Sequence, residues 1–297
     1  MYDICCIGHI TLDKVVTPQK VVHMAGGTSF YFSNAIRNMD VKYHLVTALS
    51  TKEMSSVIAL REKNIGITVL PSKHTVYFEN IYPENQDHRI QKVSQKADPF
   101  TVDRLSDIDA KIFHLGPLLA DDMPVSLIKL LAGKGKVSLD VQGYLREVRG
   151  EDVFPLDWTE KKEALPYTDI LKANETEMEK LTGQTDIEAG AKILASWGVK
   201  EVVITLGSKG SVIYFEDTFY KIPAYKAIEV VDATGCGDTY MAGYLCQRIK
   251  GASVQQAGEF AAAMATIKIQ SSGPFTGKEE DVVRMISSDT KKVFAVQ

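Results

Sequence analysis

Strand-like and helix-like segments alternate along most of this chain, and that alternation constrains the fold more than any other feature. Buried strands are expected at residues 2–10, 42–49, 110–116, 136–141, 168–174 and 201–207. Helical periodicity appears between them, at residues 28–39, 55–64, 124–135, 175–183 and 186–198. Short strands that alternate with longer helices are typical of βαβ units. The sequence therefore predicts a three-layer α/β/α fold around a mostly parallel central sheet.

Two segments interrupt this rhythm with β character of their own. Residues 74–95 alternate with a period of two and turn at residues 83–87, which predicts a β-hairpin. Residues 11–27 have the same strand, turn and strand character. We expect lid segments at approximately 11–24 and 70–96 to form one small β-sheet over an edge of the domain; two unrelated surface hairpins are the alternative. A lid would serve an enzyme that transfers phosphate, because such an enzyme must exclude water.

The composition narrows the class of protein. The 297 residues show no repeat and no low-complexity linker, so a single domain over residues 1–297 is expected. The net charge of -4 argues against nucleic acid or an anionic membrane as a partner. Four cysteines in so long a chain are typical of reduced thiols in a cytoplasm. The N-terminus lacks a basic region, and no apolar run approaches the roughly 20 residues that cross a bilayer. We expect a cytoplasmic protein with a small-molecule partner.

The stretch "VVDATGCGDTYMAGY", residues 230–244, carries the chemistry. The pattern predicts a strand at 227–231 and a helix after it, which places Gly235, Cys236 and Gly237 at a helix N-terminus. Free backbone N–H groups and the helix dipole favour an anion there, and glycines let the backbone approach it closely. Asp238, in the first helical turn, can accept a proton. The pattern indicates phosphoryl transfer to a hydroxyl group.

Two other interpretations of this stretch remain open on the residues alone. In the first, it is an ordinary turn, and Asp238 caps the helix. In the second, Cys236 is a reactive thiol, because a helix N-terminus lowers the pKa of a cysteine. A GxxxxGK[ST] phosphate-binding loop is absent from the sequence, which argues against a Walker-type nucleotide site.

"DATGCGDTYMAGY" closely resembles the second signature of the PfkB, or ribokinase-like, carbohydrate kinases. Further motifs follow the family order: "GHITLD" with Asp13, the di-glycine Gly26-Gly27, "NETE" at 174–177 and "TLGSKG" at 205–210. The resemblance implies a ribokinase-like kinase whose base is Asp238. It implies that the amides of residues 235–237 form the anion hole.

The resemblance also implies the ligands. Asn174 and Glu177 would organise Mg²⁺ through water, although "NETE" alone reads as a capped helix start. Asp232 and Thr234 match positions that contribute to a monovalent-cation site in this family, with K⁺ as the expected ion. Further residues would line the ATP site, although "GSKG" alone is an ordinary turn. These residues are Thr205, Gly207, Ser208, Lys209 and Gly210.

The acceptor is indicated by "SLDVQGYLR", residues 138–146. Its pattern is similar to that of myo-inositol kinases of the family, and Gln142 and Arg146 can hydrogen-bond a ring edged with hydroxyls. Ribose is disfavoured, because Thr28 and Tyr31 stand where ribokinases carry a basic residue and an asparagine. The sequence thus predicts an ATP-dependent sugar or polyol kinase, with Asp13, Gly26 and Gly27 also at the acceptor.

Several alternatives to myo-inositol stay open. The acceptor could be a ketose, 2-keto-3-deoxygluconate, a nucleoside or a sugar phosphate, the last by way of His88, Arg89 and Lys92 in the hairpin. The chain could also be a non-catalytic regulator of the same fold, although Asp238, the glycines and the NxxE motif are all present. By resemblance, a homodimer through the lid is expected.

Overall fold

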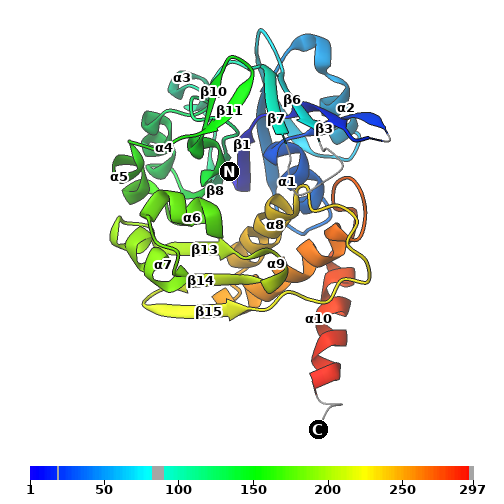
Figure 1. The fold of residues 1–297 in the computed structure, drawn as a ribbon, viewed down its shortest axis with the longest axis vertical. Coiled ribbons are helices and arrows are strands. Elements are labelled where there is room, and N and C mark those ends of the chain that lie inside the picture. Colours follow the sequence, from blue (N-terminus) through cyan, green and yellow to red (C-terminus); the bar gives the residue numbers. More distant parts are fainter. Residues whose placement is uncertain (19, 82–89, 294–297) are drawn as a thin grey trace.

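Two β-sheets organise the computed structural model, which describes residues 1–18, 20–81 and 90–293 (Figure 1). The larger sheet has nine strands in the order β15-β14-β13-β12-β9-β8-β1-β4-β5. Its strands are β1 Tyr2–Gly8, β4 Tyr43–Leu49, β5 Gly66–Pro71, β8 Ala110–Gly116, β9 Lys136–Asp140, β12 Ile170–Asn174, β13 Glu201–Thr205, β14 Ser211–Phe215 and β15 Thr218–Ile222. The strands from β5 to β13 are parallel, and β14 and β15 join antiparallel. The predicted parallel core is confirmed.

Helices cover both faces of this sheet and bury two apolar clusters. One face packs against α1 Thr28–Ile36, α2 Ser55–Arg61, α8 Cys236–Ile249 and α9 Val254–Ile269. The other packs against α4 Val125–Ala132, α5 Lys161–Ala164, α6 Glu175–Thr182 and α7 Ile187–Ser196. Helix α3 is Val102–Leu105, and α10, Glu279–Val293, packs against α9. The three-layer fold is the one that the alternating pattern predicts.

The smaller sheet brings the two predicted β segments together. Its order is β10-β11-β7-β6-β2-β3. The strands are β2 Thr11–Val16, β3 Val21–Gly26, β6 Val76–Ile81, β7 Ile90–Gln95, β10 Arg146–Arg149 and β11 Asp152–Pro155. Because β2 pairs with β6, the segments form one sheet rather than two separate hairpins. Strands β10 and β11 extend it beyond the sequence prediction, while residues 83–87, His88 and Arg89 lie outside the described residues. Its roles as a lid and a dimer interface stay predictions.

The prediction of a strand at 227–231 is wrong. Residues 227–231 form no strand, and the side chains of Ile228 and Val230 are 97% and 71% exposed. The backbone of this loop is held instead by the end of α9, where the Ile269 carbonyl accepts hydrogen bonds from Val231 and Asp232. β-branched apolar residues are common in strands, which explains the prediction, but here Val230 lines a cavity and Ile228 lies in solvent.

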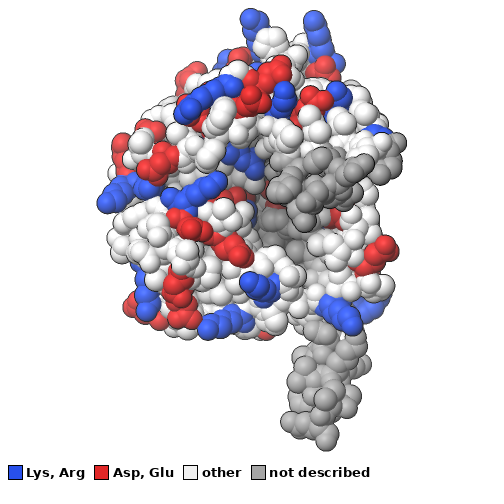
Figure 2. Space-filling view, in the orientation of Figure 1, with Lys and Arg blue, Asp and Glu red and all other residues white. Residues whose placement is uncertain are grey.

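Charge and hydropathy on the described surface agree with the composition. Figure 2 shows acidic and basic side chains interspersed over this face of the molecule, without a broad area of one sign. In the part of the chain that the structure describes, no helix has the length and apolar character that a membrane span needs.

Candidate active site

The site lies where the parallel strands end. Strands β9, β12 and β13 end side by side at Asp140, Asn174 and Thr205. The carboxyl ends of parallel strands meet at one edge of a sheet, where α/β folds bind ligands. Helix α8 begins at the same edge, and two cavities open there.

The first cavity, of about 260 Å³, lies between the two sheets; we call it the acceptor cavity. Most of the predicted acceptor residues line it, including Asp13, Gly27, Gln142 and Arg146. Gly26 lies behind this wall: a Cβ atom there would stand 2.3 Å from Oδ2 of Asp13, so only glycine allows that carboxylate its place. The remaining lining residues are Val15, Met24, Thr28, Tyr31, Phe78, Asn80, Gln91, Leu118, Asp140, Lys172, Ala233, Thr234, Gly235, Gly237 and Asp238.

The second cavity, of about 780 Å³, lies between the end of β13 and helix α9; we call it the donor cavity. Of the residues predicted to bind ATP, all but two line it: Asn174, Thr205, Gly207, Ser208 and Gly210. Lys209 and Glu177 are absent from its wall. The sequence prediction missed its apolar side, which comprises Ala224, Tyr225, Ala227, Val230, Tyr240, Ala262, Ala265 and Ile269.

The two cavities share Ala233 and Gly237 in their walls. Gly235 is the N-cap of α8 with φ of 75°, and no side chain caps this helix, so Asp238 is not a capping residue. A Cβ atom on Gly235 would stand 2.2 Å from the Tyr31 ring. Glycine is therefore required at this position by the left-handed backbone and by the Tyr31 ring, whether or not a phosphate binds nearby.

Asp238 lies half-buried in the acceptor cavity, among other charges. Burial, with the neighbouring Asp140 carboxylate, raises the pKa of Asp238 to about 6, although Lys172 and a hydrogen bond from Thr28 act in the opposite direction. A carboxylate with this pKa is a stronger base than an exposed aspartate and is still ionised at neutral pH. It suits the abstraction of a hydroxyl proton.

Lys172 and Asp140 form a buried ion pair that the sequence prediction missed. They are register partners on β12 and β9, and Nζ of Lys172 lies 3.0 Å from Oδ2 of Asp140 and 3.8 Å from Oε2 of Glu177. Burial lowers the pKa of Lys172, but the charges of Asp140 and Glu177 outweigh it and hold this pKa well above its usual value. A Cβ atom on Gly237 would stand 3.3 Å from Nζ. A permanent cation thus lies beside the anion hole.

Cys236 does not have the properties of a reactive thiol. Burial raises its pKa to about 11, so the thiol is protonated at neutral pH. Its Sγ lies 3.8 Å from the carbonyl of Ala265, within hydrogen-bonding range for sulfur. The side chain contributes to packing, and the backbone amide remains for the anion hole.

The "NETE" segment forms the capping box that its pattern predicts. The Asn174 side chain accepts a hydrogen bond from the Glu177 amide at 2.8 Å, and the Glu177 carboxylate accepts one from the Asn174 amide at 2.8 Å. The box holds both side chains at the start of α6, between β12 and the donor cavity. Their role at Mg²⁺ stays a prediction.

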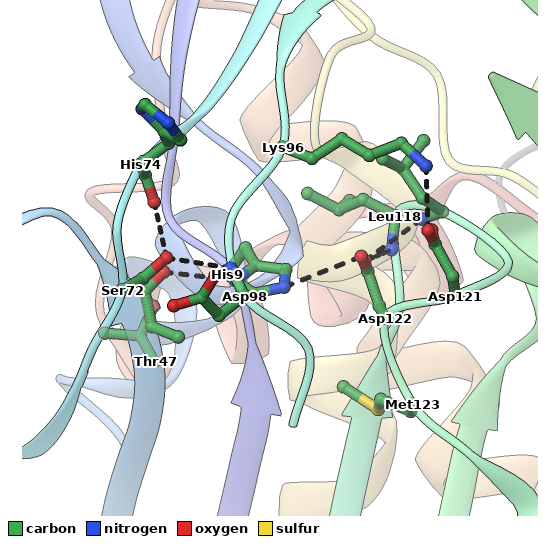
Figure 3. Close-up of polar contacts among 12 residues, drawn as sticks. His9, Thr47, Ser72, His74, Lys96, Asp98, Leu118, Asp121, Asp122 and Met123 are labelled. Carbon is green, nitrogen blue, oxygen red and sulfur yellow. Dashed lines mark hydrogen bonds and ion pairs between the residues drawn. The ribbon is translucent and has the colours of Figure 1, made fainter. Parts of the chain in front are cut away.

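His9 and Asp122 form a buried pair, drawn in Figure 3, beside one wall of the acceptor cavity. His9 is fully buried after β1, and its Nε2 lies 3.6 Å from Oδ1 of Asp122. Oδ2 of Asp122 accepts hydrogen bonds from the amides of Leu118 and Leu119, at 2.7 and 3.0 Å. Because Leu118 lines the acceptor cavity, we interpret Asp122 as a positioning residue for that wall.

We expect Asp122→Ala to lower the free energy of unfolding by about 3–5 kcal/mol, because it leaves Nε2 of His9 and two backbone amides without a partner, while Nδ1 of His9 keeps its contact with the Ala48 carbonyl. The matched control is Asp121→Ala, which removes an exposed pair to Lys96 and should cost about 1 kcal/mol or less. Denaturant unfolding of both variants measures this. Burial lowers the pKa of His9, but Asp122, the Ala48 carbonyl and Asp121 together outweigh burial and raise this pKa. The stabilisation by the pair is therefore fully present below about pH 6.5 and is lost as pH rises through the raised pKa. The cost of Asp122→Ala should therefore be larger at pH 6 than at pH 8.

Comparison with known proteins identifies the family of the chain. Residues 2–281 match the model of the pfkB family carbohydrate kinases. The cytidine kinase of Thermococcus kodakarensis is 30% identical over 271 residues, or 86% of this chain and 92% of that protein. A pyrophosphate-dependent kinase of the ribokinase family, solved with a pyrophosphate analogue and myo-inositol, is 29% identical with a TM-score of 0.84, over 95% of this chain and 99% of that chain.

Ribokinase from Arabidopsis thaliana, solved with ribose and ATP, has a TM-score of 0.77 at 21% identity, over 96% of this chain and 98% of that chain, and shares the fold. The family model covers nearly the whole chain and includes residues 235–238. The chain therefore belongs to the PfkB family of carbohydrate kinases and is a phosphotransferase, a sugar or nucleoside kinase with the ribokinase-like fold.

Proposed function

We propose that the protein transfers the γ-phosphate of ATP to a hydroxyl of a small polyol or sugar, with myo-inositol as the leading acceptor. One observation carries the proposal: the donor and acceptor cavities meet at Gly237, the residue of the proposed anion hole that precedes Asp238. A phosphoryl group passing from one cavity to the other would cross the N-terminus of α8, where backbone amides stabilise its charge.

The chemistry follows from the groups on either side of this crossing. Asp238 accepts the proton of the acceptor hydroxyl as the oxygen attacks phosphorus, and Lys172 offsets the negative charge on the phosphoryl oxygens. Asp140 holds the ammonium of Lys172 in place through the 3.0 Å ion pair. The carboxylate of Asp13 and the Gln142 and Arg146 side chains orient the acceptor.

Magnesium is the metal that this chemistry calls for. The described residues contain no group of three or more His, Cys, Asp or Glu side chains that could ligate an ion directly. This fits Mg²⁺ bound to the phosphates and to water, with Asn174 and Glu177 as oxygen partners behind the water. When bound, the ion neutralises charge on the phosphates.

The apolar wall of the donor cavity favours a nucleotide over pyrophosphate. Tyr225, Val230 and Ile269 surround a space that a purine could fill, and pyrophosphate has no group to bury there. Val230, which lines the donor cavity and is 71% exposed, would gain an apolar partner when the base binds. The 29%-identical kinase solved with a pyrophosphate analogue makes pyrophosphate the donor to test against ATP.

The acceptor cavity favours a compact, polyhydroxylated molecule. Its volume of about 260 Å³ lies just under the usual range for drug-sized ligands, which suits one ring better than a nucleoside. Asn80 and Gln91 also line it, and Nε2 of Gln91 donates to Oδ1 of Asn80 at 2.9 Å. Among described residues its cations are Arg146 and Lys172, and Asp140 already neutralises Lys172, so a sugar phosphate is less favoured.

Turnover measurements with ATP or pyrophosphate as the donor test the proposal. The acceptors are myo-inositol, ketoses, 2-keto-3-deoxygluconate, cytidine and fructose 6-phosphate. We expect the highest kcat/KM with ATP and myo-inositol. A preference for cytidine, as in the name of the Thermococcus relative, would overturn the acceptor assignment. Turnover with pyrophosphate and none with ATP would overturn the donor assignment.

Gln142→Ala should raise the KM for the acceptor about 10-fold and leave the KM for ATP unchanged. Gln142 lines the acceptor cavity and not the donor cavity, and one or two lost hydrogen bonds are worth about 1–2 kcal/mol. Gln184→Ala, at an exposed position, is the matched control and should change neither constant. Equal increases in both KM values would remove Gln142 from the acceptor site.

A further inference from the structure

Lys268 is a charged side chain with no contact to solvent. It lies in the last turn of α9 and is 0% exposed. Its Nζ donates to the carbonyl oxygen of Asp232 at 2.8 Å and lies 3.3 Å from Oδ2 of the same residue. The carbonyl of Ser271 is a third oxygen, at 3.4 Å. Because a buried charge is costly unless oxygens replace its water, this cage of oxygens requires an explanation.

The cage belongs to the loop that carries the anion hole. Oδ1 of Asp232 accepts a hydrogen bond from the Thr234 amide at 2.9 Å, one residue before the Gly235 N-cap. Burial raises the pKa of the Asp232 carboxyl, but hydrogen bonds from Thr234 and the charge of Lys268 outweigh it, so the group stays ionised. Lys268 thus holds residues 232–234 in place through Asp232. Thr234, in the same segment, lines the acceptor cavity.

The oxygen cage has the ligand chemistry of a monovalent-cation site. Two backbone carbonyls and a carboxylate would suit K⁺ or an ammonium ion equally, because both are compact single charges. Asp232 and Thr234 are the residues predicted to hold such an ion. With Nζ already against the Asp232 carbonyl and Oδ2, a separate K⁺ would have to share this carboxylate with a second cation. These residues therefore do not fit a dissociable ion.

We infer that the ammonium of Lys268 takes the place of a monovalent cation, so that the anion hole is assembled without K⁺. The inference rests on the proposed phosphoryl transfer for its effect on turnover, but its effect on folding stands apart. An internal cation supplies fixed charge beneath the amides of residues 235–237 and holds the approach to α8 in one conformation. Turnover then does not depend on which monovalent cation is present in solution.

Turnover of the wild-type protein should be the same in KCl, NaCl and tetramethylammonium chloride at one ionic strength. Lys268→Met keeps the apolar stem but removes the charge, and should lower kcat about 10²-fold in tetramethylammonium chloride, the loss typical of one anion-stabilising group. KCl or NH₄Cl should then restore part of the activity. Lys180→Met, at an exposed position on α6, is the matched control and should show neither effect.

Thermal melting of the same proteins, without donor or acceptor, measures cation binding independently of turnover. We expect the Tm of Lys268→Met to rise with KCl relative to tetramethylammonium chloride, and that of the wild type to be unchanged. Wild-type turnover that depends on K⁺ would overturn the inference. A Lys268→Met protein whose Tm and activity do not change with K⁺ would also overturn the inference. A wild type that turns over no acceptor would instead contradict the proposed function, and the melting result would still decide the cation site.

Discussion

Asp238→Asn should lower kcat by about 10²–10⁴-fold and leave ATP affinity nearly intact, because the variant loses the proton acceptor but keeps the anion hole. The side chain lines the acceptor cavity and not the donor cavity. Cys236→Ala is the matched control within the same loop. It keeps the backbone amide and removes a protonated, half-buried thiol, so its kcat should change little. A folded Cys236→Ala protein that binds ATP and has no activity would overturn the assignment of Asp238.

The raised pKa of Asp238 gives the same prediction a pH dependence. Activity requires the ionised form, so kcat/KM of the wild type should rise with pH through about 6. A carboxyl group whose pKa is higher in the folded state stabilises the fold below the unfolded value of 3.8, and this contribution is lost as pH rises through about 6. At pH 8 the ionised group therefore costs stability, and Asp238→Asn should melt no lower than the wild type. A Tm that falls at pH 8 would indicate that Asp238 has a structural role instead.

The sequence predicted the elements that repeat a local pattern. Each expected strand from residues 2–10 to 201–207 has a counterpart in the central sheet, because a buried strand between two helices is apolar throughout its length. The helix N-terminus at residues 235–237 was also predictable, because its glycines and Asp238 lie within four consecutive positions. The strand prediction for 227–231 was wrong because its apolar residues do not pack in a sheet: Ala227 and Val230 line a cavity, and Ile228 lies in solvent.

Contacts between distant segments could not be read from one sequence. Asp140 and Lys172 are 32 positions apart and meet only because β9 and β12 are neighbours with that register. Lys268 and Asp232 meet because α9 ends beside the loop that precedes α8. The sequence offered one signal for the first pair, a lysine near the end of a strand expected to be buried. For Lys268, a lysine in the last turn of a helix is ordinary, and only its burial is unusual.

The second large effect is expected at Lys172. If its ammonium stabilises the phosphoryl group in transfer, Lys172→Met should lower kcat by about 10²–10³-fold. Lys200→Met is the matched control, because Lys200 makes a 2.7 Å ion pair with Asp169 but its side chain is 71% exposed. That variant should keep wild-type kcat.

A merely structural role for Lys172 would also reduce activity, so the pH profile provides the discriminating measurement. The charge of Lys172 lowers the pKa of Asp238, against burial and Asp140, which raise it to about 6. Without this charge, the acid limb of kcat/KM should shift to higher pH in the residual activity of Lys172→Met, and Lys172→Arg should return the limb toward its wild-type position. A Lys172→Met profile with an unshifted limb would show that the ammonium and Asp238 do not act on each other, and the cation beside the anion hole would then have only a structural role.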